Sequence, residues 1–446
     1  MSDMLSIGAS GLRAYQVALN TVSENIANAG VTGYSRRTAA TTEVAAVNRA
    51  GSLNGLGALV TGVTRVSDMY RAAEVRSSGS DLAKTEASVT WLDRIETSLS
   101  GSQLGTRLSG FFTAATTLAG DPTSLGARAS MLEAAAGVAT AFSDTGASLD
   151  QIGQDLDGTA RASIQSLNTN AAALAKVNDG LSRAGAGTAG AAALQDQRDQ
   201  LLEAMSALTD ISVQFDGIGR ATVRGGGAAG PVLVDGNQAA TTTYTANASG
   251  AVSFNVVNGA SLQALSPVGG ALAGVVDSMQ RIASAKEALG DIAQNFVDGV
   301  NAAQSAGRDL DTLPGAAMFA IDPAAGTAQV TMTLDDPRGI AAAAVGGGTR
   351  DNTNLAALAS LRVSGKFETG IADLITTNAA TLAQRKAVAD AQSTIHDNAI
   401  TARESVSGVD LDAEAVDLMR FQQAYSATSR VIQVSRDVMQ SILDIR

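Results

Sequence analysis

Two segments at opposite ends of the chain carry the same heptad spacing of apolar side chains. In the first, apolar or small residues recur at alternating steps of three and four: Leu5, Gly8, Leu12, Tyr15, Leu19, Val22 and Ile26. In the last, apolar residues recur every seven positions with others beside them: Leu411, Leu418, Tyr425, Ile432 and Met439, then Phe421, Val438 and Ile442. One helix cannot bury its own apolar stripe, so each stripe requires a partner helix. The spacing fits either a helix pair within one chain or an element that also contacts neighbouring subunits.

The composition argues against several classes of function. The 446 residues include 31 Lys and Arg against 43 Asp and Glu, a net charge of −12, and no basic patch stands out to bind nucleic acid. Because no apolar run reaches about 18 residues and no basic amphipathic stretch occurs, we expect no contact with a membrane. The lack of cysteine and the single histidine exclude Cys-based zinc sites and multi-His metal sites. The N-terminus shows no cleaved secretory signal, which predicts a cytoplasmic protein or one exported by another route.

The apolar spacing changes along the chain in a way that suggests several domains. Residues 3–28 predict a first helix, roughly 40 Å long. Residues 35–66 are rich in Thr and Val and predict a loop with short strands. Helical spacing over residues 82–208 is typical of long antiparallel helices with short connections. Alternating apolar residues and glycine turns over residues 211–267 predict a small β domain, and helical spacing resumes at Leu272.

The predicted fold is mainly α with a β insertion, in an elongated multi-domain protein. Residues 1–35 and 405–446 are expected to pair as a terminal coiled-coil domain. Residues 36–210 and 268–404 form a long helical-bundle middle domain, into which residues 211–267 insert as a small β domain. Because the chain leaves through helices and returns through helices, this order places both termini at one end of the molecule.

The residues that could support catalysis or metal binding have simpler structural interpretations. His396 lies in a predicted helix, and no nucleophile elbow accompanies it. The alternating acids of Asp309-Leu310-Asp311 and Asp410-Leu411-Asp412 lack the glycine and terminal glutamate of a calcium loop. Gly225-Gly226-Gly227 is not followed by the Lys-Ser/Thr of a phosphate-binding loop. We therefore predict no catalytic residue, no cofactor and no metal, in a protein that is not an enzyme.

Residues at both ends resemble the signatures of bacterial flagellar axial proteins, the family of rod, hook and hook-associated subunits. The N-terminal match is Asn25-Ile26-Ala27-Asn28 followed by Gly33-Tyr34-Ser35-Arg36. The C-terminal match is Val409-Asp410-Leu411-Asp412-Ala413-Glu414-Ala415, then Phe421-Gln422-Gln423-Ala424-Tyr425 and Val431-Ile432. The segment 194–201 and the helical middle are similar to the hook-associated members. One departure is Val31-Thr32, where the family usually has Thr-Pro before Gly-Tyr.

The resemblance implies a structural component of the flagellum at the junction of hook and filament, which allows the flagellin filament to assemble. Its implied partners are the hook protein, the second junction protein (hook-associated protein 3) and further copies of itself in a ring or helical turn. An export chaperone is implied for the C-terminal region. The implied location is the extracellular flagellum, reached unfolded through the type III export channel without a cleaved signal peptide.

The heptads and the resemblance together assign two sets of assembly-interface residues. On the N-terminal helix and the turn after it they are Leu5, Leu12, Tyr15, Leu19, Val22, Ile26, Asn28, Gly33 and Tyr34. On the C-terminal helix they are Leu411, Leu418, Phe421, Gln422, Tyr425, Ile432, Met439 and Ile442. Residues 1–35 and 405–446 are expected to be mobile in the monomer and ordered only in the assembly.

Three other functions compete with this one. A flagellar hook or distal rod subunit is the nearest alternative, although a hook subunit should turn mainly to β structure soon after its first helix. A cell-envelope enzyme, such as a muramidase domain fused to a rod-type protein, would need a carboxylate pair in a cleft, and the sequence shows no isolated catalytic domain. A coiled-coil adhesin would need a signal peptide or an anchor.

Overall fold

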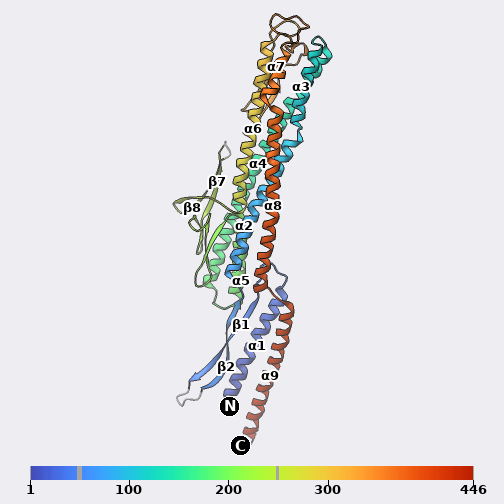
Figure 1. Ribbon diagram of the computed structural model, residues 1–446. Coiled ribbons are helices and arrows are strands. Elements are labelled where there is room, and N and C mark those ends of the chain that lie inside the picture. Colours follow the sequence, from blue (N-terminus) through green and yellow to red (C-terminus); the bar gives the residue numbers. More distant parts are fainter. Residues whose placement is uncertain (1, 48–52, 248–250, 445–446) are drawn as a thin grey trace.

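The protein is an elongated bundle of helices with a β-rich insertion on one side (Figure 1). The structure, a computed structural model, describes residues 2–47, 53–247 and 251–444. A pair of terminal helices forms one end of the molecule, and both termini lie at that end (Figure 1). The predicted fold class, a mainly α and elongated protein with an inserted β region, is confirmed.

Long helices build the bundle that occupies the middle and the far end of the molecule. They are α2 (Met69–Gly101), α3 (Leu104–Gly120), α4 (Leu125–Arg183), α5 (Ala189–Leu208), α6 (Gly270–Ala306), α7 (Leu355–Gly365) and α8 (Phe367–Ser407). Short polar side chains fix where several of them begin: Asp68, Ser124 and Thr188 each accept hydrogen bonds from backbone N–H groups of the first turn. α4 alone spans 59 residues and runs along most of the bundle.

A cluster of aromatic rings forms the core of the far end, where α6 meets the small hairpin of β10 (Phe319–Ile321) and β11 (Val330–Met332). Phe296 lies at its centre and is fully buried. Its ring centroid lies 5.4–6.2 Å from those of its neighbours, Phe319, Phe111, Phe367, Phe142 and Phe112. Because these rings come from α3, α4, α8 and β10, Phe296 holds together elements that are far apart in the sequence. The short 3₁₀ helix η1 (Pro337–Gly339) closes this end.

The β insertion consists of two antiparallel sheets beside α4 and α5. One contains β3 (Ile211–Phe215), β4 (Ala221–Gly225), β5 (Val232–Asp235) and β6 (Gln238–Ala239), and the other contains β7 (Thr241–Ala246), β8 (Val252–Asn258) and β9 (Ser261–Leu265). Val223 and Val234 are buried beneath the first sheet. The side chain of Asn178 on α4 is fully buried and hydrogen-bonds both the N–H and the C=O of Ala221. These contacts attach the insertion to the helical bundle.

The terminal pair consists of α1 (Ser2–Asn28) and α9 (Leu411–Asp444), which run antiparallel. Small residues let the two backbones approach each other: Gly8 faces Ile432, and Gly11 faces Thr428. A Cβ atom at Gly8 would lie 2.8 Å from the Ile432 side chain. The contacts run in opposite order along α1 and α9, as they do in an antiparallel pair, and they define its register.

A long antiparallel ribbon lies beside α1, where the sequence predicted a loop with only short strands. It is made of β1 (Arg37–Val47) and β2 (Leu53–Arg65), and β2 packs against α1. The prediction was wrong because the ribbon is irregular. Register shifts between Ala40 and Thr41 and between Glu43 and Ala45 interrupt the period of two by which a strand is recognised.

One of the contacts between the ribbon and the bundle is a close approach of two glycine backbones, Gly62 and Gly187, and it gives a test of how firmly the ribbon is held. The N–H of Val63 donates to the C=O of Gly187, in the turn before α5, at 2.6 Å. A Cβ atom at Gly62 would lie 2.6 Å from that same oxygen, and the φ of Gly62 is +152°. We expect Gly62→Ala to lower the free energy of unfolding of this region by about 1–3 kcal/mol, measured as faster amide exchange in β2.

Gly190→Ala is the matched control, because Gly190 lies in the first turn of α5 and a Cβ atom there would meet only Thr188 at 3.9 Å. Equal exchange in the two variants would contradict the expectation for Gly62.

Candidate assembly interface

The predicted residues of α1 and of the middle of α9 lie between the two terminal helices or at the edge of their contact. Val22 is buried, and the other predicted apolar residues of α1 are half-buried: Leu5, Leu12, Tyr15, Leu19 and Ile26. On α9 the half-buried residues are Leu418, Phe421, Tyr425 and Ile432. The ring centroids of Tyr15 and Phe421 are 6.4 Å apart. The two heptad stripes therefore meet within one subunit along the middle of the pair.

The predicted residues at the two ends of α9 are exposed instead. Leu411, Met439 and Ile442 expose 53%, 50% and 49% of their surface, and Gln422 is also exposed. Because Gly8 lies opposite Ile432 in an antiparallel pair, Met439 lies beyond the start of α1. The C-terminal end of α9 extends past the N-terminus (Figure 1). Among the described residues, the last part of this heptad stripe thus has no helix to pack against.

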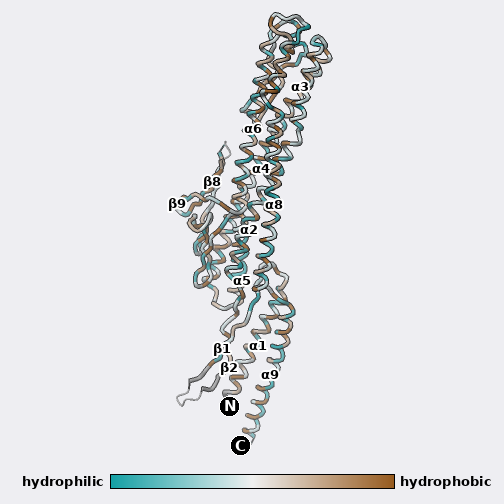
Figure 2. The backbone as a smooth tube through the Cα atoms, viewed as in Figure 1, coloured by the Kyte–Doolittle hydropathy of each residue, from teal (hydrophilic) through white to brown (hydrophobic). Residues whose placement is uncertain are grey.

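A second apolar stripe runs along the face of α9 that points away from α1, and sequence reasoning missed it. We call it the outer stripe: Val416, Met419, Val431, Val434 and Val438, which are 44–59% exposed. Hydrophobic bands recur along α9 toward the C-terminus (Figure 2). Met4 and Ile7 on α1 are exposed as well. Steps of three and four join Val416 to Met419 and Val431 to Val434 and Val438, but twelve residues separate these two groups, and only Val438 was noted beside the heptad. Exposed apolar stripes of this kind mark surfaces that bind another protein.

The predicted residues in the turn after α1 make contacts inside the subunit. Asn28 donates to the C=O of Glu24 on its own helix. Gly33 has a φ of +79°, and its missing side chain leaves room for Gln200 of α5, which donates to the C=O of Thr32 at 2.8 Å. The Tyr34 hydroxyl donates to the Asn25 side chain at 2.9 Å. The turn at Gly33 therefore connects the terminal pair to the bundle, whereas Asn28 and Tyr34 bind residues of α1.

Buried polar side chains connect the terminal pair, the ribbon and α5. We call this cluster the polar joint: Asn25, Arg36, Arg37, Arg65, Asp196, Asp199 and Glu414. Asn25 is fully buried, and its amide nitrogen donates to the C=O of Arg37 at 2.9 Å and to Glu414 at 3.0 Å. Its amide oxygen accepts from the N–H of Arg37 at 3.0 Å and from Tyr34. Every hydrogen-bonding position of this buried amide is thereby used.

Arginines of the ribbon bind carboxylates of α5 in the second half of the joint. Asp196 lies 3.2 Å from Arg37 and 2.8 Å from Arg65, in ion pairs whose side chains are all about nine-tenths buried. Arg65 also binds Asp199 at 2.5 Å. Burial raises the pKa of Asp196, although the two arginines oppose this effect. Sequence reasoning noted this part of α5 only as a resemblance, because its partners lie more than a hundred residues away in the chain.

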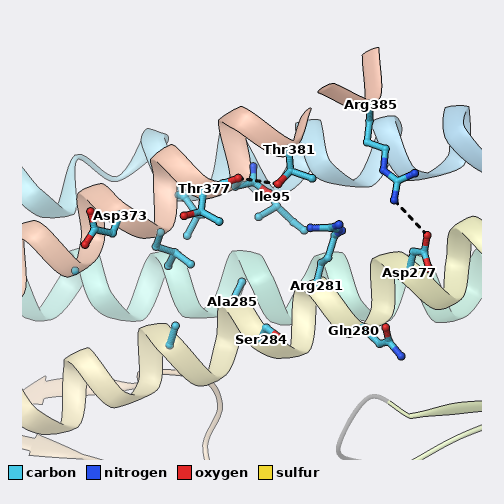
Figure 3. Close-up of a pocket in the computed structure, with 15 residues that line it drawn as sticks. Ile95, Asp277, Gln280, Arg281, Ser284, Ala285, Asp373, Thr377, Thr381 and Arg385 are labelled. Carbon is cyan, nitrogen blue, oxygen red and sulfur yellow. Dashed lines mark hydrogen bonds and ion pairs between the residues drawn. The ribbon is translucent and has the colours of Figure 1, made fainter. Parts of the chain in front are cut away.

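A groove in the bundle offers another candidate site, and its chemistry does not suggest catalysis. It encloses about 670 Å³ between α2, α6 and α8, over an apolar floor that includes Ile95. Arg281 points into it, and Arg385 reaches across to Asp277 at 3.7 Å (Figure 3). These are the charged and apolar groups of a helix contact, with no nucleophile beside a base among the lining residues.

The lone histidine belongs to a helix contact as well. The His396 ring nitrogen lies 3.0 Å from the Ser78 hydroxyl and packs against Gly79 of α2. Over the described ranges, no cluster of three or more His, Cys, Asp or Glu side chains could hold a metal ion. In that same part of the chain, every helix is too short or too polar to cross a membrane.

The paired terminal helices flanking a helical bundle define the architecture of a flagellar axial subunit, and comparisons with known proteins agree. Residues 5–34 match the family model of flagella basal body rod proteins, and residues 403–445 match that of the flagellar basal body rod FlgEFG protein C-terminal region. Residues 91–319, slightly more than half of the chain, match the flagellar hook-associated protein FlgK helical domain. The chain belongs to the family of the flagellar hook-associated protein FlgK.

The similar proteins are flagellar hook-associated or hook junction proteins. The flagellar hook-associated protein 1 of Salmonella typhimurium is 29% identical to this chain. The match covers 72% of this chain and 60% of that relative's length. The Escherichia coli protein of the same name is 26% identical, with both chains covered completely. The solved structure of the flagellar hook junction protein FlgK from Burkholderia pseudomallei is 21% identical, with a TM-score of 0.50 over 56% of this chain and 46% of that one. This last likeness concerns the fold alone.

Proposed function

We propose that this chain is a structural subunit of the bacterial flagellum, at the junction between the hook and the filament. The observation that carries the proposal is the outer stripe, an apolar face left open on a terminal helix pair in a member of the FlgK family. The similar proteins are named hook-associated protein 1, and the Burkholderia protein is named a hook junction protein. The chain acts by binding and not by catalysis.

The geometry suggests how such a subunit would assemble. The inner faces of α1 and α9 close on each other, so the outer stripe and the free end of α9 are available to neighbouring copies. In this proposal residues 1–35 and 405–446 form the inner layer, and both sets of predicted interface residues contribute to it. Residues 36–210 with 268–404, and the insertion 211–267, lie further out.

The proposed partners follow from a position between two different polymers. They are the hook protein on one side, the second junction protein (hook-associated protein 3) on the other, and copies of this chain around the axis. An export chaperone that covers the apolar C-terminal helix before assembly fits the same surface. We propose export to the extracellular flagellum through the type III channel, without cleavage of a signal peptide.

A hook or distal rod subunit remains the second candidate, because both ends match rod-protein models. The middle of the chain favours the junction, since it matches the helical domain of FlgK.

Deletion of the gene distinguishes the two candidates. We expect cells without this protein to build hooks, to lack filaments, and to release flagellin monomers into the medium. Electron microscopy of the cells and immunoblots of the medium measure this result, and expression of the full chain should restore filaments. Loss of the hooks themselves would favour the rod or hook subunit, and hooks bearing normal filaments would exclude both.

A further inference from the structure

The terminal pair is held by two kinds of contact, and they divide it into two parts. The proximal part, next to the bundle, includes Asn25, Arg36 and Glu414, all members of the polar joint. The Glu414 side chain is fully buried; one of its oxygens accepts from Asn25 at 3.0 Å and the other from Arg36 at 2.6 Å. Both oxygens of this carboxylate therefore bind groups from the N-terminal segment.

The proximal part is also attached directly to the bundle. The N–H of Arg36 donates to the C=O of Ser407, the last residue of α8, and the C=O of Arg36 accepts from Val66. Arg37 binds Asp196 of α5, and Gln200 of α5 holds the turn at Thr32. Ser407, Asp196 and Gln200 belong to helices of the folded bundle, and Val66 directly follows β2 of the ribbon.

The distal part is held by weaker contacts. Its two helices approach closely where Gly8 faces Ile432 and Gly11 faces Thr428, and the tilted rings of Tyr15 and Phe421 meet between them. On its other side α1 packs against β2, where the N–H of Ala58 donates to the Ser10 hydroxyl at 3.2 Å. Three members of the outer stripe in the distal part, Val431, Val434 and Val438, leave apolar surface of α9 open to water. The side chains that the distal part of α1 buries are the small ones of Ala14 and Ala18, and a helix pair that buries only small side chains is marginally stable in water.

We propose that the polar joint is a docking site that keeps the proximal part of the terminal pair ordered in the free monomer, whereas only the distal part orders on assembly. The expectation that residues 1–35 and 405–446 are mobile as a whole is thereby narrowed to residues before about Asn20 and after about Phe421. The proximal part of the terminal pair would then be preformed and held at a fixed angle to the bundle. From it the distal parts of α1 and α9 would extend onto neighbouring subunits. This inference does not rest on the proposed function, because it concerns the monomer.

Amide hydrogen exchange of the monomeric full chain tests the inference. We expect residues 21–37 and 408–418 to exchange as slowly as α5. Residues 4–14 and 428–444 should exchange at least about 100-fold faster than α5. Uniformly fast exchange from both termini up to the bundle would overturn the proposal, as would protection that extends unchanged to both tips. Either result would leave the proposed function standing.

Glu414→Gln tests the role of the joint itself. Both Glu414 oxygens accept hydrogen bonds, but a glutamine has one oxygen and places an N–H₂ group against a donor. We expect the proximal amides to exchange at least about 100-fold faster in this variant, because a buried N–H₂ group then faces a donor and the more distant Asp417, at 3.5 Å, is the carboxylate left to pair with Arg36. Glu404→Gln, the same change at an exposed position of α8, should leave them unchanged.

A second variant keeps the test decisive if Glu414→Gln disturbs the whole chain, which faster exchange in α4 would reveal. Asn25→Ala removes the buried amide of the joint. Asn20→Ala, which removes an exposed amide from the same helix, is its control. Faster proximal exchange in the first alone would support the proposal. No difference between the two would overturn it.

Discussion

Replacing Val434 with aspartate will prevent this chain from assembling into the flagellum while leaving the free monomer folded. Val434 belongs to the outer stripe and exposes 58% of its surface in the subunit, so a carboxylate there remains hydrated in the monomer. In an assembly that covers the stripe, the same carboxylate would lose its water without gaining a partner. The cost of at least several kcal/mol for each subunit recurs in every copy around the axis. Counting filaments per cell by electron microscopy measures the loss.

Val363→Asp is the matched control for this prediction. Val363 lies on α7 in the bundle and is 77% exposed, so the substitution adds the same charge to the same kind of side chain. We expect cells with Val363→Asp to grow filaments, and circular dichroism of both purified variants to match the parent protein. Normal filaments on cells that produce Val434→Asp would show that the outer stripe is not an assembly surface.

The sequence predicted the terminal pair well because a heptad is a short-range pattern. Leu418, Phe421 and Ile432 follow it, and they lie against or beside α1. The pattern could not show where the partner helix ends, which depends on the register of two segments about four hundred residues apart. For this reason Met439 was expected in the seam but lies beyond it.

Sequence periodicity could not predict the polar joint, for a different reason. Asn25, Asp196 and Glu414 have no pattern that relates them, and each is an ordinary polar residue of a helix when it is read alone. Only the fold brings them together, by returning α9 to the base of the bundle beside α5. The resemblance to axial proteins identified the segments that contain these residues, but it gave no reason for their chemistry. The structure supplies that reason, because each polar atom of Asn25 has a partner.

The largest expected effect on stability comes from Phe296→Ala at the far end of the bundle. Phe296 is fully buried, and its ring touches aromatic rings from α3, α4, α8 and β10. Removing it leaves a cavity bounded by stiff rings that cannot collapse into the space. We expect the free energy of unfolding of this cluster to fall by about 3–5 kcal/mol. Trp91, the single tryptophan, belongs to the same hydrophobic cluster, so its fluorescence during urea unfolding reports the change.

Phe421→Ala removes the same atoms from the terminal pair and serves as the control. Phe421 is half-buried, and the ring nearest to it is that of Tyr15, at the opposite end of the molecule from Phe296. If the bundle is stabilised by its own core, the urea midpoint reported by Trp91 should fall in Phe296→Ala and stay at the parent value in Phe421→Ala. Equal midpoints in the two variants would mean that the far end does not depend on the Phe296 cluster. A fall in both would mean that the terminal pair and the bundle unfold as one unit, because the loss of a contact at one end would then be felt at the other.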